Sequence, residues 1–189
     1  MWDPYIASVH KYTGAEIVFD KFHVAKKANE ALDSVRKKEF RNSTPEDRRD
    51  MKNKRLLIHR REKNLPDDKR ESLAALLAKN ETLTKAYLLK EQLLHILDEC
   101  DWQLAEQRLV TWKKNVLDSG LKEIEKLLKT LYNYMYGILN YFKYRLTNAG
   151  SEGFNNKINL IRRSYGYHDI EYFKPKILLE FAKAKICGQ

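Results

Sequence analysis

Cysteine, glycine and proline are scarce in this sequence of 189 residues, which contains two, seven and four of them. The two cysteines, Cys100 and Cys187, supply neither a disulfide framework nor the ligand set of a structural zinc site. We therefore expect a reducing, cytoplasmic setting. No internal repeat or low-complexity tract stands out. With 43% hydrophobic and 33% charged residues, the composition favours a soluble, helix-rich globular protein over a disordered one.

Long hydrophobic runs are also missing. No apolar stretch approaches the roughly 20 residues that a helix needs to cross a bilayer. The first residues, Met1 to Pro4, show neither a basic segment nor an apolar core, so a secretory signal is not expected. A membrane is therefore not among the expected partners.

Positive charge is abundant and unevenly distributed. The formal net charge is +10. Residues 21–70 hold 17 Lys and Arg against 9 Asp and Glu, residues 71–110 hold 4 against 7, and residues 111–189 hold 14 against 7. Two basic regions around an acidic one fit a protein that lays two surfaces on a polyanion such as DNA. The same distribution is equally typical of solvated helix faces.

The spacing of apolar residues predicts helices along most of the chain. Asp3 and Pro4 suit the start of a short helix that Gly14 ends. Asp20 is a suitable cap for a helix whose apolar residues recur on one face, namely Val24, Ala28, Ala31 and Val35. Residues 42–66 show the least regular pattern. Further helices are predicted from Pro66 to Asn80, with Leu73, Leu76 and Leu77 buried, and over 82–99 and 102–118.

A regular apolar seam follows Ser119 and Gly120. Its residues alternate by three and four and are Leu121, Ile124, Leu128, Leu131, Met135, Ile138 and Phe142. This spacing predicts one long helix that packs against other helices. If the seam were exposed in the monomer, it would serve as a surface for forming a homodimer or for pairing with an intact relative.

Only residues 15–19 have the composition of a β-strand, a short run rich in β-branched residues. One strand cannot form a sheet. Either this segment is not a strand, or the rest of its sheet lies upstream in a longer chain. The expected fold is mainly α with this one strand.

Three motifs, in this order, resemble the ISL-three family of bacterial insertion-sequence transposases. The first is Met1-Trp2-Asp3-Pro4-Tyr5-Ile6, and the second runs from Glu16 to Val24 with an Asp-x-x-His element at Asp20 and His23. The third and most specific runs from Arg145 to Ile158 and continues through Arg162-Arg163-Ser164-Tyr165-Gly166-Tyr167 to Phe173. The resemblance covers essentially the whole chain.

The resemblance implies an RNase H-like domain interrupted by an all-helical insertion. It divides this chain into a core remnant over 1–41, the insertion over 42–120 and a glutamate-bearing region over 121–189. In the family, two aspartates and one glutamate bind two Mg²⁺ or Mn²⁺ ions that promote DNA cleavage and strand transfer. Hard divalent cations prefer oxygen ligands, and two ions must straddle one phosphate.

Glu152 matches the family's catalytic, metal-binding glutamate. Its place near the start of a helix that begins around Asn148 also suits a simple interaction with the helix dipole. Asn156, Asn159 and Arg163 are expected on the polar face of this helix. The expected buried face consists of Phe154, Ile158 and Ile161. Asn156, Lys157, Arg162 and Arg163 are the predicted DNA contacts.

Asp20 and His23 match an element that supports the family's active site. From the residues alone, Asp20 is also a helix cap for the amide of His23. Asp3 is interpreted as a cap, because the family's second catalytic aspartate would precede Met1. With one catalytic carboxylate of three, we expect a truncated transposase that binds no metal and is inactive alone. The alternative is a non-enzymatic, basic, helical DNA-binding or dimerising regulator. Pro175 departs from a helix that the family usually continues.

Overall fold

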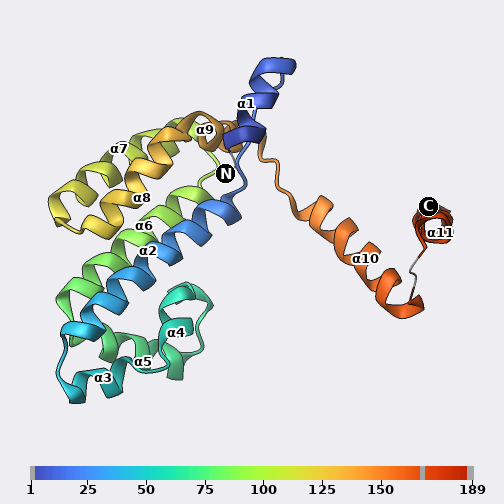
Figure 1. Cartoon of the computed structure of the whole chain (residues 1–189). Coiled ribbons are helices and arrows are strands. Elements are labelled where there is room, and N and C mark those ends of the chain that lie inside the picture. Colours follow the sequence, from blue (N-terminus) through green and yellow to red (C-terminus); the bar gives the residue numbers. More distant parts are fainter. Residues whose placement is uncertain (1–2, 167–168, 187–189) are drawn as a thin grey trace. The chain divides into compact units, whose positions relative to one another are not determined.

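The computed structural model describes residues 3–166 and 169–186, and every regular element within these ranges is a helix (Figure 1). Met1, Trp2 and Tyr167 of the three motifs, and Cys187, lie outside the described residues. The chain divides into two compact units, Met1–Leu146 and Thr147–Gln189. Each unit is described by itself.

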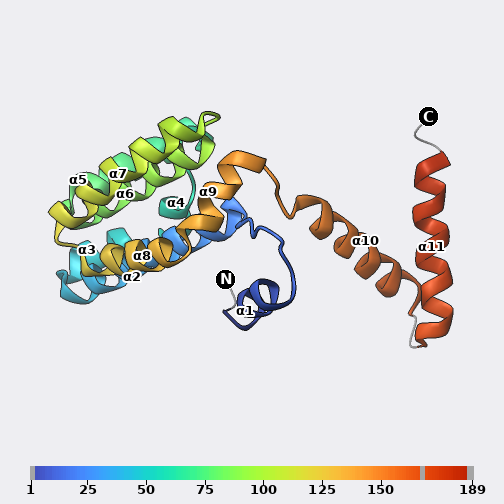
Figure 2. The ribbon, with the colours of Figure 1, turned by 90° about the horizontal axis from the view of Figure 1, so that it is seen from above.

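Four helices form the body of the first unit: α2 (Lys21–Asn42), α6 (Glu81–Asp98), α7 (Trp102–Ser119) and α8 (Lys122–Asn133). Helix α2 packs against α6 and α8, and α7 packs against the same two helices, which closes the bundle. Figure 2 shows α6 and α7 in one layer and α2 and α8 in the other. The apolar stripe of α2 lies in this core, with Val24, Ala28 and Val35 buried and Ala31 half-buried.

Short helices lie beside the four-helix body of the first unit. α3 (Pro45–Met51), α4 (Arg55–His59), the 3₁₀ turn η1 (Glu62–Asn64) and α5 (Asp67–Ala78) connect α2 to α6. Leu73 and Leu76 of α5 are buried, as the sequence predicts, and Leu77 is half-buried. α1 (Asp3–Tyr12) buries no residue. α9 (Met135–Tyr144) follows α8 and packs on α7.

The second unit contains α10 (Ala149–Tyr165) and α11 (Ile170–Ile186), which contact each other. Ile161 of α10 is buried, and Lys157 Nζ donates to the carbonyl oxygen of Glu180 at 3.3 Å. Pro175 lies inside α11, where it has no amide hydrogen to donate to the preceding turn.

The predicted strand over residues 15–19 is wrong. This segment has no regular secondary structure, and the described residues contain no strand with which it could pair. Its polar backbone groups bond to α9 instead: the Phe19 amide donates to the Gly137 carbonyl at 3.0 Å, and Asn140 Nδ2 donates to the Ile17 carbonyl at 3.0 Å. Glycine is required at residue 137, because a Cβ there would lie 2.4 Å from the Phe19 ring. Composition favoured a strand, but α9 supplies the hydrogen bonds.

The single long helix predicted after Gly120 is also wrong, because the chain leaves helical geometry at Tyr134 (φ −116°, ψ 16°) and forms α8 and α9. Tyr134 donates a hydrogen bond from its hydroxyl to Asp3, and its ring meets Phe19 edge-on at 5.5 Å. Asp3 and Phe19 are far from Tyr134 in the sequence, so the spacing of apolar residues around Tyr134 did not reveal the break between the two helices.

The apolar seam is inside the first unit. Its fully buried members, each no more than 6% exposed, are Ile124, Leu128, Leu131, Ile138 and Phe142. The seam therefore packs against neighbouring helices of the same unit and is not an exposed dimerisation surface. This excludes the exposed-seam form of the dimer hypothesis.

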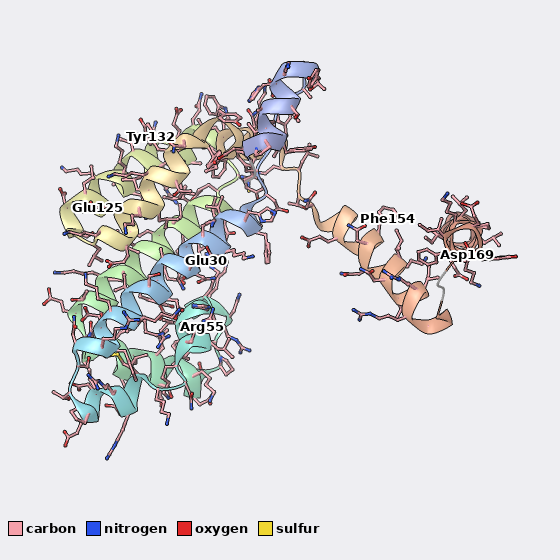
Figure 3. All side chains as sticks on the ribbon, in the orientation of Figure 1. Glu30, Arg55, Glu125, Tyr132, Phe154 and Asp169 are labelled. Carbon is pink, nitrogen blue, oxygen red and sulfur yellow. The ribbon has the colours of Figure 1, made fainter. Side chains whose placement is uncertain are left out.

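Buried charges lie where α2, α4 and α6 approach one another. Asp33 pairs with Arg36 at 2.8 Å and with Lys37 at 3.1 Å. Burial opposes ionisation of Asp33, but these hydrogen-bonded cations hold its pKa below the usual range. Arg55 of α4, shown in Figure 3, lies 3.6 Å from the same carboxylate and links α4 to α2.

His59, at the end of α4, provides a test of this arrangement. Burial lowers its pKa; Arg55, Lys90 and Arg36 act in the same direction, and Asp33 opposes them. Below the ordinary histidine pKa of about 6.5, the unfolded chain takes up a proton that the folded chain resists. We expect the free energy of unfolding to fall as the pH drops from 7.5 through this window, and less steeply in His59→Gln. Urea unfolding across the pH range measures this, and identical pH profiles for the two proteins would contradict it.

Candidate functional site

Asp20 caps α2. Its Oδ1 accepts a hydrogen bond from the Phe22 amide at 2.8 Å, and its carbonyl oxygen accepts from the His23 amide at 3.0 Å. The predicted capping role is confirmed, although the amide bound by the side chain is that of Phe22 and not that of His23. His23 is exposed in the first turn of α2, and its ring lies 6.0 Å from that of Phe22. Whether this pair supports an active site stays a prediction.

Asp3 has a structural contact of its own. It lies in the first turn of α1 and accepts a hydrogen bond from the Tyr134 hydroxyl. This bond is the main cause of a raised pKa for Tyr134. Asp3 therefore connects α1 to the junction between α8 and α9.

Glu152 lies in the first turn of α10, which begins after Asn148 as the sequence predicts. The Glu152 amide donates to the Asn148 carbonyl at 2.8 Å, and the side chain is exposed. An exposed carboxylate at a helix N-terminus interacts favourably with the helix dipole and remains accessible to a cation. The position suits both interpretations of Glu152.

The polar face of α10 follows from Glu152 at helical spacing, with Asn156, Asn159 and Arg163 all exposed. Arg162 is exposed as well. These residues are accessible to a polyanion. Lys157 is half-buried, and its bond to the Glu180 carbonyl ties α10 to α11.

The predicted buried face of α10 is confirmed only in part. Ile161 is buried and Ile158 half-buried, but Phe154 is 57% exposed (Figure 3). Within the second unit α10 contacts α11, and Phe154 nevertheless stays more than half exposed.

A metal site requires several converging ligands. Across residues 3–166 and 169–186, no group of three or more His, Cys, Asp or Glu side chains is placed to hold a metal ion. Two divalent cations bound about 3.5–4 Å apart need several shared carboxylates. The described residues of either unit alone do not fit this donor set.

Two adjoining hollows gather basic side chains that the sequence did not single out. They lie beside α3, α4 and α5, have volumes of about 270 and 360 Å³, and share Lys54 and Ser72 in their walls. We define the α3–α5 basic face by the cations that line them: Arg49, Lys54, Arg60, Lys69 and Lys79. The sequence signal for four of these cations was the charge excess over residues 21–70, and Lys79 lies outside that region.

None of the described helices combines the length and apolar character needed to cross a membrane.

Comparison with known proteins agrees with the motifs. Residues 1–177 match a family model described as a transposase of the ISL-three type. The chain is also 36% identical over 174 residues to a Bordetella parapertussis protein named as the transposase for insertion sequence element IS1001. That match covers 88% of this chain and 42% of the relative, so the chain spans about two fifths of the relative's length. No solved structure matches the chain.

Proposed function

Because the chain belongs to the ISL-three family of transposases, we propose that it forms the glutamate-bearing part of a DDE catalytic region and binds DNA without sequence preference. In such a transposase the whole protein performs metal-dependent DNA cleavage and strand transfer. Glu152 would supply one carboxylate to an RNase H-like active centre, and Asp20 and His23 would support that centre. The observation that carries the proposal is the exposed Glu152 at the start of α10, inside the most specific family motif.

The surroundings of Glu152 support a role beside DNA. Asn156 and Arg163 extend the same face of α10, so amide and guanidinium donors lie in line with the carboxylate. Arginine and asparagine are common donors to DNA phosphates. A metal-binding carboxylate needs such neighbours, because the substrate it serves is itself an anion.

The chain alone is proposed to be inactive. One carboxylate leaves Mg²⁺ largely hydrated, since this ion gives up its water reluctantly. Among the described residues, no group of three or more His, Cys, Asp or Glu side chains could hold a metal ion together. Catalysis would then require carboxylates that only a more complete catalytic domain brings together.

DNA binding tests the first part of the proposal. We expect the purified chain to bind two unrelated 30-base-pair duplexes with affinities that agree within about threefold. Binding should weaken with salt, with a log–log slope of about −0.9 for each phosphate neutralised. Fluorescence anisotropy at several salt concentrations measures both quantities. An Arg162→Gln, Arg163→Gln double variant should show a shallower slope.

Two results would contradict DNA binding of this kind. One is an affinity that does not change with salt, because phosphate contacts necessarily release counterions. The other is strong selection of one duplex, since phosphate contacts carry no sequence information.

A further inference from the structure

We infer that the α3–α5 basic face is a second DNA-backbone-binding surface, formed by residues other than those of α10 and independent of catalysis. This inference rests on the proposed DNA-binding function and adds the location of a contact surface. The two hollows adjoin each other, because Lys54 and Ser72 contribute to the walls of both.

The walls of these two hollows are strongly positive. Five cations line them, and Asp50 is the only acidic residue among their lining residues. Asp50 pairs with Lys79 at 2.5 Å, and Lys69 lies 3.7 Å from Asp68. Within the part of the chain that the structure describes, Arg49, Lys54 and Arg60 form no ion pair, so their charges are not compensated locally.

The backbone that carries these cations is fixed in place. Met51, Leu57 and Ile58 are buried, which anchors α3 and α4 to the unit. Lys90 of α6 donates a hydrogen bond from its Nζ to the carbonyl oxygen of Arg60 at 3.3 Å. Arg48 bonds to the carbonyls of Phe40 and Arg41 and holds α3 to the end of α2.

A pre-positioned set of cations loses little backbone entropy when an anion binds. Arg49 and Arg60 are exposed, and Lys54 is half-buried. These three residues therefore have an anchored backbone and charged groups that an anion can reach.

The matching partner is a regular, extended array of anions. The uncompensated cations are divided between the two hollows: Arg60 lines one, Arg49 lines the other, and Lys54 lines both. A single small anion in one hollow would therefore not engage all three. Duplex DNA carries one negative charge for about every 1.7 Å of its axis and offers several phosphates at once. The shared chemistry is that of Arg and Lys with phosphate oxygens, which position DNA without reading its sequence.

The test compares two triple variants with equal charge loss. The first is Arg49→Gln, Lys54→Gln, Arg60→Gln on the α3–α5 basic face. The control is Lys122→Gln, Lys126→Gln, Lys129→Gln, which removes three exposed lysines from α8. The probe is a 30-base-pair duplex in the salt titration used for the unaltered chain, and thermal unfolding by circular dichroism verifies that each variant is folded. An Arg49→Gln, Arg60→Gln double variant, altering only exposed residues, repeats the test if the triple variant unfolds.

We expect the first triple variant to raise Kd at least about tenfold at 0.1 M salt. Its log–log salt slope should be shallower by about 2.7, the value for three phosphate contacts. The control should raise Kd no more than about threefold. Equal losses in the two variants would overturn the inference, because they would show a response to net charge alone. Unchanged binding in the first triple variant would also overturn it, while loss in Arg162→Gln, Arg163→Gln would leave the proposed function standing. Failure of the unaltered chain to bind any duplex would overturn the proposed function itself.

Discussion

Lys90→Ala is expected to lower the free energy of unfolding of the first unit by about 3–5 kcal/mol, the usual effect of breaking a buried ion pair. Lys90 lies on α6 and is 1% exposed. Its ammonium pairs with Glu91 at 2.5 Å and donates to the Ile58 carbonyl at 3.1 Å. Its Nζ also lies 4.3 Å from the centre of the Tyr87 ring.

The cost of the substitution comes from what remains behind. The end of α4 would lose the donor for its last carbonyl groups, and Glu91 would keep a largely buried charge without its cation. Burial already lowers the pKa of Lys90, with Glu91 opposing that shift. The charged lysine is thus held by specific partners in an environment that otherwise disfavours it.

Urea unfolding followed by circular dichroism measures the effect. Lys85→Ala is the matched control on the same helix, because Lys85 is exposed and its ion-pair partner, Glu81, is exposed as well. Its loss should stay within about 1 kcal/mol. Lys90→Met, which keeps the apolar stem, serves if Lys90→Ala does not fold. Combining Lys90→Met with Glu91→Gln should recover part of the loss. Equal stability of Lys90→Ala and Lys85→Ala would refute this role for the buried ammonium.

The features of the fold that could be predicted from the sequence are local ones. The burial of Val24, Ala28 and Val35 follows from their spacing along one helix. The Asp20 cap and the left-handed Gly120 (φ +66°) that ends α7 depend on their own few neighbours. Each of these features is determined by residues within one or two helical turns, so it can be predicted from the local sequence.

The two errors concern contacts between distant segments. Residues 15–19 have strand composition, but strand formation depends on a partner, and the available hydrogen bonds come from Gly137 and Asn140. The apolar seam continues in register through Tyr134, where contacts with Asp3 and Phe19 accompany the break. Apolar spacing predicts which face is buried and does not predict where a helix stops.

The candidate site also has some features that the local sequence predicts and others that depend on packing between segments. The start of α10 near Asn148 and the exposure of Glu152 follow from local pattern and from the family motif. The exposure of Phe154 depends on how much of α10 is covered by α11. The α3–α5 basic face is formed by packing, since Arg49, Lys54 and Lys79 come from separate segments. The charge count of the sequence revealed an excess of positive charge, but it could not predict which cations lie together on one surface.

Glu152→Gln is expected to reduce transposition at least about 100-fold once this chain is supplied with the rest of a transposase. We propose a chimaera in which the chain replaces the matched 174-residue segment of the Bordetella parapertussis relative. Gln keeps the size of Glu152 and removes the negative charge that would hold a divalent ion. A metal ion contributes several kcal/mol of transition-state stabilisation, and each 1.36 kcal/mol corresponds to a tenfold change in rate.

The chimaera is assayed by the mobility of a marker flanked by the relative's element ends, with protein levels followed by immunoblotting. Glu171→Gln is the matched control, because Glu171 is also an exposed glutamate in the first turn of a helix of the second unit. It should leave mobility within about threefold of the unaltered chimaera. A simple helix-dipole role predicts similar small effects at both positions, since such interactions contribute about 1 kcal/mol or less when exposed. Equal mobility of Glu152→Gln and Glu171→Gln would therefore remove Glu152 from the catalytic centre.

The isolated chain provides the complementary result. With Mg²⁺ or Mn²⁺ it should leave supercoiled plasmid intact, and Glu152→Gln or Asp3→Asn should change nothing. The reason is that Glu152 offers one carboxylate, Asp20 caps α2 and Asp3 accepts a hydrogen bond from Tyr134. Metal-dependent nicking that both substitutions abolish would make Asp3 a working ligand and the chain a minimal enzyme. In that outcome Asp3 would have to exchange its bond to Tyr134 for a metal ion, and Tyr134→Phe would then raise the nicking rate by freeing the carboxylate.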